Sequence, residues 1–197
     1  MYIPEAYAWS DAAAIERFIA ERGFATLVTP ALDATSLPLL WRRVDGDGVL
    51  CGHLARRNAM AEGLDGQSVL LLYEGVDGYV SPDVYGKPDV PTWNYVSVQV
   101  HGTCRLTDPE TTWQDLVDLV RAHDQAPGVL AHLEAASTRA EMAGLVGLRV
   151  ENLRLEGKRK LSQNRPQADR MGVVLDLLRR RDPRAAALAA EMAGLLP

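Results

Sequence analysis

The segment from residue 79 to residue 106 restricts the possible folds of this chain more than any other stretch. Val96, Val98 and Val100 alternate with polar residues, and a period of two is typical of a strand with one buried face. Three prolines precede that strand, and they stiffen the backbone and withhold N–H donors from a sheet. We therefore expect two β segments joined by a rigid loop.

Aromatic and short polar side chains are concentrated in and beside this loop. They are Ser81, Tyr85, Thr92, Trp93, Asn94 and Tyr95. A stiff surface of this composition suits a flat ligand with polar edges. The alternative is that the aromatic side chains only plug the end of a barrel, and the loop by itself favours that alternative.

The rest of the chain predicts further short strands, separated by turns and short helices. Strands are expected at 24–29, 36–43, 49–56, 68–73 and 146–155, with turns at 45–48 and 77–78. Helices are expected at 9–23 and 107–123, from residue 166 onward, and at 185–195. Strands that follow one another in this way predict a mainly β protein with α-helices (α+β), built on an antiparallel barrel. Glycine-rich motifs of the Rossmann or P-loop type do not occur in the sequence.

Charge is distributed unevenly along the chain. The formal net charge is −5 and the isoelectric point about 5.4, so no overall basic field attracts nucleic acid. Residues 151–184 nevertheless hold ten Lys and Arg against five Asp and Glu. This basic segment is suited to a phosphate, to an acidic partner surface, or to solubility alone.

The cysteines and histidines give no metal-binding pattern. Cys51 and Cys104 lie in predicted strands, and the four histidines form no HxxxH or HExxH motif. No signal peptide and no apolar run of 18 residues is apparent, so we expect a cytoplasmic protein with reduced thiols and no membrane partner.

Two segments that follow strands carry candidate anion-binding side chains. Arg56 and Asn58 stand at the end of one predicted strand, just before a helix start, where free N–H groups and a guanidinium suit a phosphate. Residues 156–165 form a predicted turn rich in donors, among them Lys158 and Lys160. The alternative for both segments is a set of solvated surface charges, which contribute little.

Five separated motifs, in order, resemble the PaiB family of FMN-binding proteins described as negative regulators of transcription. They are GHLARRN at 52–58, YVSPDVY at 79–85, VPTWNY at 90–95, HG at 101–102 and RLEGKRKLSQNRPQADRMGV at 154–173, and the opening MYIPEAYAWSD fits as well. The resemblance extends from the start to about residue 178. The chain departs from it at Ala59, where relatives often have proline, at Arg159, where they often have an aromatic residue, and in a shorter loop after Tyr85.

The resemblance implies a split β-barrel of the flavin-reductase-like type, which forms homodimers with FMN at the interface. It places a split-barrel FMN-binding domain at 1–178 and leaves a C-terminal helical extension at 179–197. On this basis Trp93 and Tyr95 wall the flavin ring, Ser81, Thr92 and Asn94 meet its polar edge, and Arg56, Lys158 and Lys160 hold the phosphate. The full set of expected cofactor-binding residues is His53, Arg56, Asn58, Ser81, Thr92, Trp93, Asn94, Tyr95, Lys158, Lys160, Ser162 and Gln163. No catalytic residue is assigned and no metal site is expected.

Three functions remain open at this point. The first is an FMN-binding homodimer with a role in negative regulation of transcription; no helix-turn-helix signature is present, and the basic segment at 151–184 is the one candidate surface for DNA. The second is a flavin-dependent oxidoreductase that takes a hydride from NAD(P)H. The third and weakest is a haem-binding barrel protein, whose axial ligand would come from His53, His101, His123 or His132.

Overall fold

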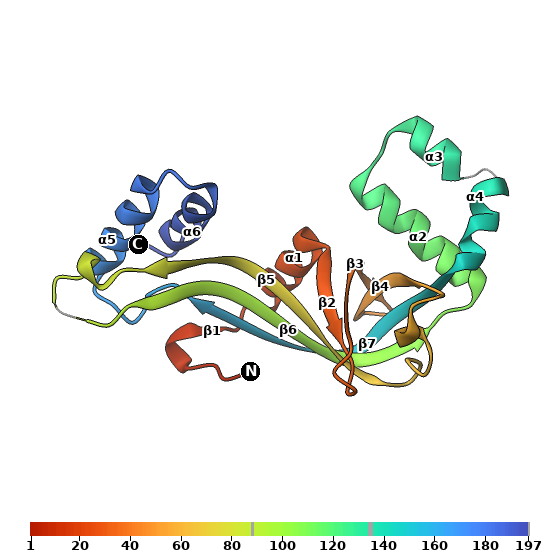
Figure 1. Ribbon diagram of the computed structural model, residues 1–197, viewed down its shortest axis with the longest axis horizontal. Coiled ribbons are helices and arrows are strands. Elements are labelled where there is room, and N and C mark those ends of the chain that lie inside the picture. The colour runs from red at the N-terminus through yellow and green to blue at the C-terminus, as the bar shows by residue number, and fades with distance from the viewer. Residues whose placement is uncertain (88, 134–135, 197) are drawn as a thin grey trace. The chain divides into compact units, whose positions relative to one another are not determined.

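Seven strands form one sheet in the order β1-β7-β4-β3-β2-β5-β6, and an additional pairing of β7 with β6 closes six of them into an antiparallel barrel (Figure 1). The computed structural model describes residues 1–87, 89–133 and 136–196. The strands are β1 Ala8–Trp9, β2 Phe24–Val28, β3 Ala34–Val44, β4 Asp47–Ala55, β5 Ser68–Val80, β6 Thr92–Leu106 and β7 Leu145–Lys160. The expected barrel of mainly β class is confirmed.

The described residues form six α-helices. They are α1 Ala12–Arg22, α2 Pro109–His123, α3 Pro127–Leu133, α4 Ala136–Glu141, α5 Gln167–Arg179 and α6 Pro183–Ala193. Helix α2 begins where the sequence predicts, because the Asp108 carboxylate accepts hydrogen bonds from the N–H groups of Glu110 and Thr111. Proline is suited to position 109, because the first residue of a helix has no hydrogen-bond partner for an N–H group within the helix. Among the described residues, no helix is long and apolar enough to cross a membrane.

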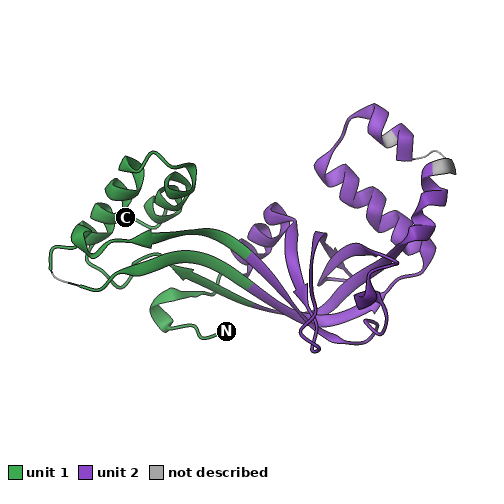
Figure 2. Ribbon diagram, in the orientation of Figure 1, with its two compact units in different colours: residues 1–11, 74–98, 156–197 green, residues 12–73, 99–155 purple. Residues whose placement is uncertain are grey.

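The chain divides into two compact units (Figure 2). The barrel unit comprises residues 12–73 and 99–155, and the terminal unit comprises residues 1–11, 74–98 and 156–197. Each unit contains part of β5, β6 and β7. The expected boundary between a domain at 1–178 and an extension at 179–197 stays a prediction.

Leucine side chains from four strands fill the core of the barrel unit. Leu27, Leu39, Leu50 and Leu71 are almost completely buried. Burying each such side chain contributes about 1.5–3 kcal/mol. Leu39 lies opposite Gly52 in the β3–β4 pair. A Cβ on residue 52 would come within 2.8 Å of the Pro38 carbonyl oxygen, so this close strand pairing needs the glycine.

Helices α5 and α6 pack together in the core of the terminal unit. Val174 and Leu177 of α5 are buried, as are Leu188 and Met192 of α6. The Leu188 side chain lies so close to β5 that a Cβ on Gly78 would be 2.8 Å from it. Helix α6 is therefore part of a packed core.

Three sequence-based predictions were wrong. The turn predicted at Asp77–Gly78 does not form, because glycine at position 78 lets Leu188 pack against a continuous strand β5. The basic turn predicted from residue 156 is strand as far as Lys160. The helix predicted from Trp9 starts at Ala12, because Ala8 and Trp9 pair with β7 instead.

Candidate functional site

The twelve expected cofactor-binding residues are divided between the two units. Nine belong to the terminal unit, and His53, Arg56 and Asn58 belong to the barrel unit. Contacts within the terminal unit bring seven of the nine together. These seven are Thr92, Trp93, Asn94, Tyr95, Lys158, Lys160 and Ser162.

Lys160 connects the end of β7 to the start of β6. Its Nζ donates hydrogen bonds to Thr92 Oγ1 and, at 2.7 Å, to the carbonyl oxygen of Trp93. Partial burial lowers the pKa of this ammonium, and the nearby charges of Lys158 and Arg165 lower it further. The positive charge of Lys160 is thus poorly solvated and lies close to other positive charges.

Lys158 is a nearly buried cation that is also surrounded by neutral groups. The residue is 8% exposed, and its Nζ donates a hydrogen bond of 3.0 Å to the carbonyl oxygen of Tyr2. The ammonium lies 5.8 Å from the ring centroid of Tyr2 and 5.2 Å from that of Tyr95. Among the described residues, no carboxylate pairs with Lys158 or Lys160. An anion is the partner that these two charges need.

A second pair of aromatic rings belongs to Tyr79 and to Trp93, whose backbone carbonyl accepts the hydrogen bond from Lys160. Trp93 is 50% exposed, and its indole N–H donates a 3.0 Å hydrogen bond to Asp77 Oδ1, which holds the ring in place. The Tyr79 ring meets it edge-on, with centroids 6.3 Å apart. We call the group Tyr2, Tyr79, Thr92, Trp93, Tyr95, Lys158 and Lys160 the lysine–aromatic cluster.

The other polar side chains of the expected site brace the backbone. Asn94, which is 1% exposed, donates a 2.9 Å hydrogen bond to Ser162 Oγ, and Ser162 adopts a positive φ of 63°. Gln163 accepts from the N–H of Leu161 and donates to the carbonyl oxygen of Arg159. Ser81 Oγ accepts from the N–H of Asp83 in a short 3-10 helix. These four side chains shape the end of β7 and the loop after β5.

The expected residues of the barrel unit have separate roles. Burial lowers the pKa of His53 and so favours its neutral imidazole. Asn58 caps a short 3-10 helix by accepting from the N–H of Met60. Arg56 donates from Nε to the carbonyl oxygen of Ala143 and from Nη2 to that of Leu145, both at 2.8 Å.

Arg56 also lines a cavity of about 740 Å³ that lies entirely within the barrel unit. The sequence analysis did not identify this cavity, because its walls come from β6, α2, α4, the 3-10 helix Met142–Gly144 and β7, together with Arg56 just after β4. Tyr2, Tyr79 and Asp77 were likewise missed as neighbours of the lysines and of Trp93. Tyr2 and Tyr79 lie in motifs that carry the family resemblance, and that resemblance could have identified them.

A flat flavin ring with a phosphate needs an aromatic wall and fixed positive charge. The lysine–aromatic cluster has both, and its two lysines have only neutral partners among the described residues. The donor set therefore fits FMN. No group of three His, Cys, Asp or Glu side chains able to hold a metal is found in the described part of the chain.

Several known proteins are similar to this chain. "Protease synthase and sporulation protein PAI 2" of Bacillus subtilis is 29% identical over 196 residues, which cover 96% of this chain and 95% of the relative. Among solved structures, the flavocytochrome Anf3 of Azotobacter vinelandii has a TM-score of 0.61 at 16% identity, over 78% of this chain and 69% of that one. The FAD and heme binding protein of Mycobacterium smegmatis has a TM-score of 0.59 at 19% identity, over 78% and 73%. These two likenesses confirm the fold.

A family model described as "Putative FMN-binding domain" matches residues 1–152. This match spans the strands from β1 to β6 and the first half of β7. The chain belongs to this FMN-binding family of split-barrel proteins.

Proposed function

We propose that this protein is an FMN-binding homodimer with a role in the negative regulation of transcription. The observation that carries the proposal is the pair Lys158 and Lys160, which lie side by side near aromatic rings with neutral partners only. Similarity to the PAI 2 protein, whose name links it to protease synthesis and sporulation, supports the regulatory part.

Lys160 and Lys158 would bind the phosphate of FMN. Their charges repel one another, and a dianionic phosphate relieves that repulsion while accepting hydrogen bonds from both ammonium groups. Thr92 Oγ1 already lies beside Lys160 and adds a hydroxyl donor. Bound FMN supplies a ring that can accept a hydride. The parts of Trp93 and Tyr95 that reach solvent would lie against that ring, and Ser81, Asn94, Ser162 and Gln163 would keep the walls in place.

Exposed apolar side chains of the terminal unit support the homodimer. Among the described residues, seven large ones are at least 40% exposed there, namely Tyr2, Tyr79, Val90, Trp93, Met171, Leu175 and Leu178. A second copy of the chain would remove them from water, and each 100 Å² of apolar surface so buried contributes about 2.5 kcal/mol before the entropic cost of association.

A direct contact with DNA has narrower support. Arg179, Arg181 and Arg184 are exposed around the turn between α5 and α6. Cations at such a turn suit phosphates, and binding through them would weaken steeply as the salt concentration rises.

The first experiment is an absorption spectrum of the purified protein followed by titration with FMN and, in parallel, riboflavin. We expect flavin bands and tighter binding of FMN than of riboflavin, because riboflavin lacks the phosphate. Sedimentation equilibrium should give twice the chain mass. Equal affinities for the two flavins, or a monomer at all concentrations, would contradict the proposal. Bleaching of bound FMN by NAD(P)H without oxygen would favour the oxidoreductase instead.

A further inference from the structure

The cavity of about 740 Å³ in the barrel unit has the size of a small-molecule site, for which about 300–1,000 Å³ is usual. We propose that it binds a small aromatic carboxylate, at a site separate from the one proposed for FMN. The inference goes beyond flavin binding and rests on the walls of the cavity alone.

Apolar side chains form most of the cavity wall. They are Leu106, Pro109, Trp113, Met142, Leu145 and Val146. An indole ring together with a flexible thioether suits a planar apolar body, because methionine adapts its shape to an aromatic ring. The body of the ligand is therefore expected to be one or two fused rings.

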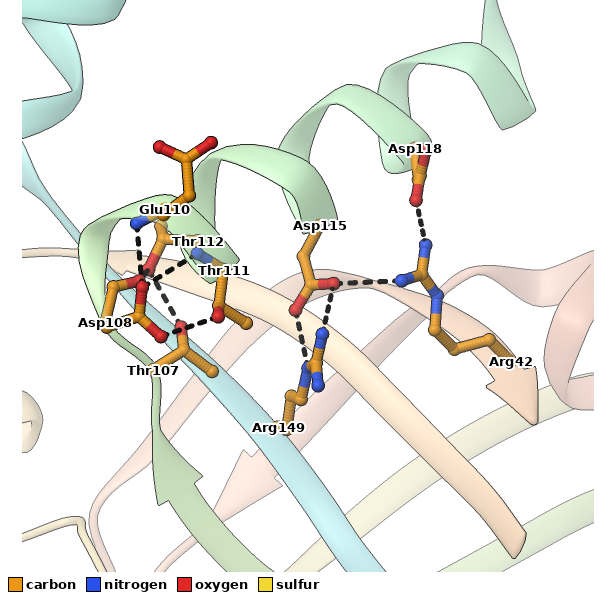
Figure 3. Close-up of polar contacts among 9 residues, drawn as sticks. All are labelled: Arg42, Thr107, Asp108, Glu110, Thr111, Thr112, Asp115, Asp118 and Arg149. Atoms are coloured by element: carbon orange, nitrogen blue, oxygen red, sulfur yellow. Dashed lines mark hydrogen bonds and ion pairs between the residues drawn. The ribbon is translucent and has the colours of Figure 1, made fainter. Parts of the chain in front are cut away.

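The polar side chains of two threonines in the wall are already satisfied by the protein. The hydroxyls of Thr107 and Thr112 lie 2.8 Å apart, and Thr112 Oγ1 also donates to the Asp108 carbonyl oxygen at 2.8 Å (Figure 3). A Cβ on Gly147 would come within 2.2 Å of both hydroxyl oxygens, so glycine is needed for this arrangement. The threonines require no hydrogen bond from a ligand, which again favours an apolar body.

Two arginines give the cavity positive charge. Arg56 donates hydrogen bonds to the carbonyl oxygens of Ala143 and Leu145, which hold its guanidinium in place without neutralising it. Such a fixed cation at an apolar cavity favours an anionic ligand.

Arg139 is the second cation, and its present anionic partner can be replaced. Its guanidinium carbon lies 5.4 Å from the centre of the Trp113 ring, and it pairs with Glu110. Glu110 is 72% exposed, so this ion pair is screened by water and contributes little. A ligand carboxylate beside the Trp113 ring could take the place of Glu110 while the ring remains stacked.

The test is calorimetric titration of the full-length protein with 1-naphthoate and with the neutral 1-naphthalenemethanol, both as purified and saturated with FMN. We expect naphthoate to bind at least about tenfold more tightly than the alcohol, since a hydrogen bond to a charged group is worth that factor or more. Arg139→Gln and Arg56→Gln should each remove most of this preference. Arg121→Gln removes the same charge at a position outside the cavity wall, and it should leave the preference unchanged.

Several results would overturn the proposal. They are absence of naphthoate binding at millimolar concentration, equal affinity for acid and alcohol, or an unchanged preference in both cavity variants. Competition between FMN and naphthoate would also overturn it, because the cavity would then be the flavin site with Arg56 at the phosphate. The comparison of acid with alcohol uses the wild-type protein, so it decides the matter even if a variant fails to fold.

Discussion

Arg149 of β7 holds Asp115 of α2 through two hydrogen bonds, from Nε to Oδ2 at 2.8 Å and from Nη2 to Oδ1 at 2.9 Å (Figure 3). Arg42 of β3 donates a third to the same carboxylate at 3.0 Å, and a further one to Asp118. Asp115 is 4% exposed. The helix that supplies Thr112 and Trp113 to the cavity is thus attached to two barrel strands through one carboxylate.

Replacing Asp115 by asparagine should destabilise the fold. The change leaves Arg149 and Arg42 without their shared anion. Breaking a buried ion pair in this way costs about 3–5 kcal/mol. Because both arginines are partly exposed, we expect the free energy of unfolding to fall by about 2–3 kcal/mol. Urea unfolding would measure it. Asp118→Asn is the matched control on the same helix, and its more exposed carboxylate should cost under about 1 kcal/mol. Equal losses in the two variants would refute the role given to Asp115.

The two thiols should be unreactive in the folded protein. Burial raises the pKa of Cys51 to about 12, with Asp115 adding to the effect, and burial raises the pKa of Cys104 to about 12 as well. A thiol reagent at pH 8 should label neither until urea is added. Because the unfolded thiols release protons near pH 9, the unfolded state binds fewer protons above that pH, and the free energy of unfolding should fall as pH rises from about 9 to 12. Rapid labelling of the native protein would disprove this.

Replacing Lys160 by alanine should weaken FMN binding by about 2 kcal/mol, or about 30-fold, while riboflavin binding changes little, because the lost interaction is with the phosphate. The chain has one lysine outside the cluster, and Lys87→Ala is therefore the control.

The lowered pKa of Lys160 adds a pH dependence. Affinity for FMN, but not for riboflavin, should fall at alkaline pH as this ammonium loses its proton below the usual lysine range. Parallel losses for the two flavins in fluorescence titrations would place the phosphate elsewhere.

Gly147→Ala should destabilise the barrel unit. The new Cβ would lie 2.2 Å from the hydroxyl oxygens of Thr107 and Thr112, and overpacking of this kind costs about 1–3 kcal/mol. Gly144→Ala is the control three residues away, where a Cβ meets nothing within 4 Å. Thermal unfolding should separate the two variants by several degrees; similar melting temperatures would show that the threonine pair moves freely.

Leu188→Ala should cost about 2–5 kcal/mol, because this fully buried side chain packs α6 onto β5 at Gly78. Leu178→Ala on the exposed side of α5 is the control for the monomer's stability. If the Leu188 variant unfolds like the wild type in urea, the last helix is not part of the cooperative core.

Local patterns were enough to predict much of the architecture. Val96, Val98 and Val100 are buried as their alternation indicates, and Asp108 with Pro109 starts a helix, because strand periodicity and helix capping depend on neighbours in the sequence. The family motifs then identified the residues around Lys158 and Lys160 as a candidate site. Both kinds of signal are contained in segments of a few residues.

Contacts between distant segments had to come from the tertiary structure. Lys160 meets Thr92 across 68 residues, and Gly78 lies within β5 because Leu188 packs against it from 110 positions further along the chain. The cavity near Arg56 likewise depends on residues from five separate elements. The sequence by itself determined most of the strands and helices, because those preferences are largely local. The folded chain decided the exceptions and which side chains share a surface, because close packing joins residues that no local pattern relates.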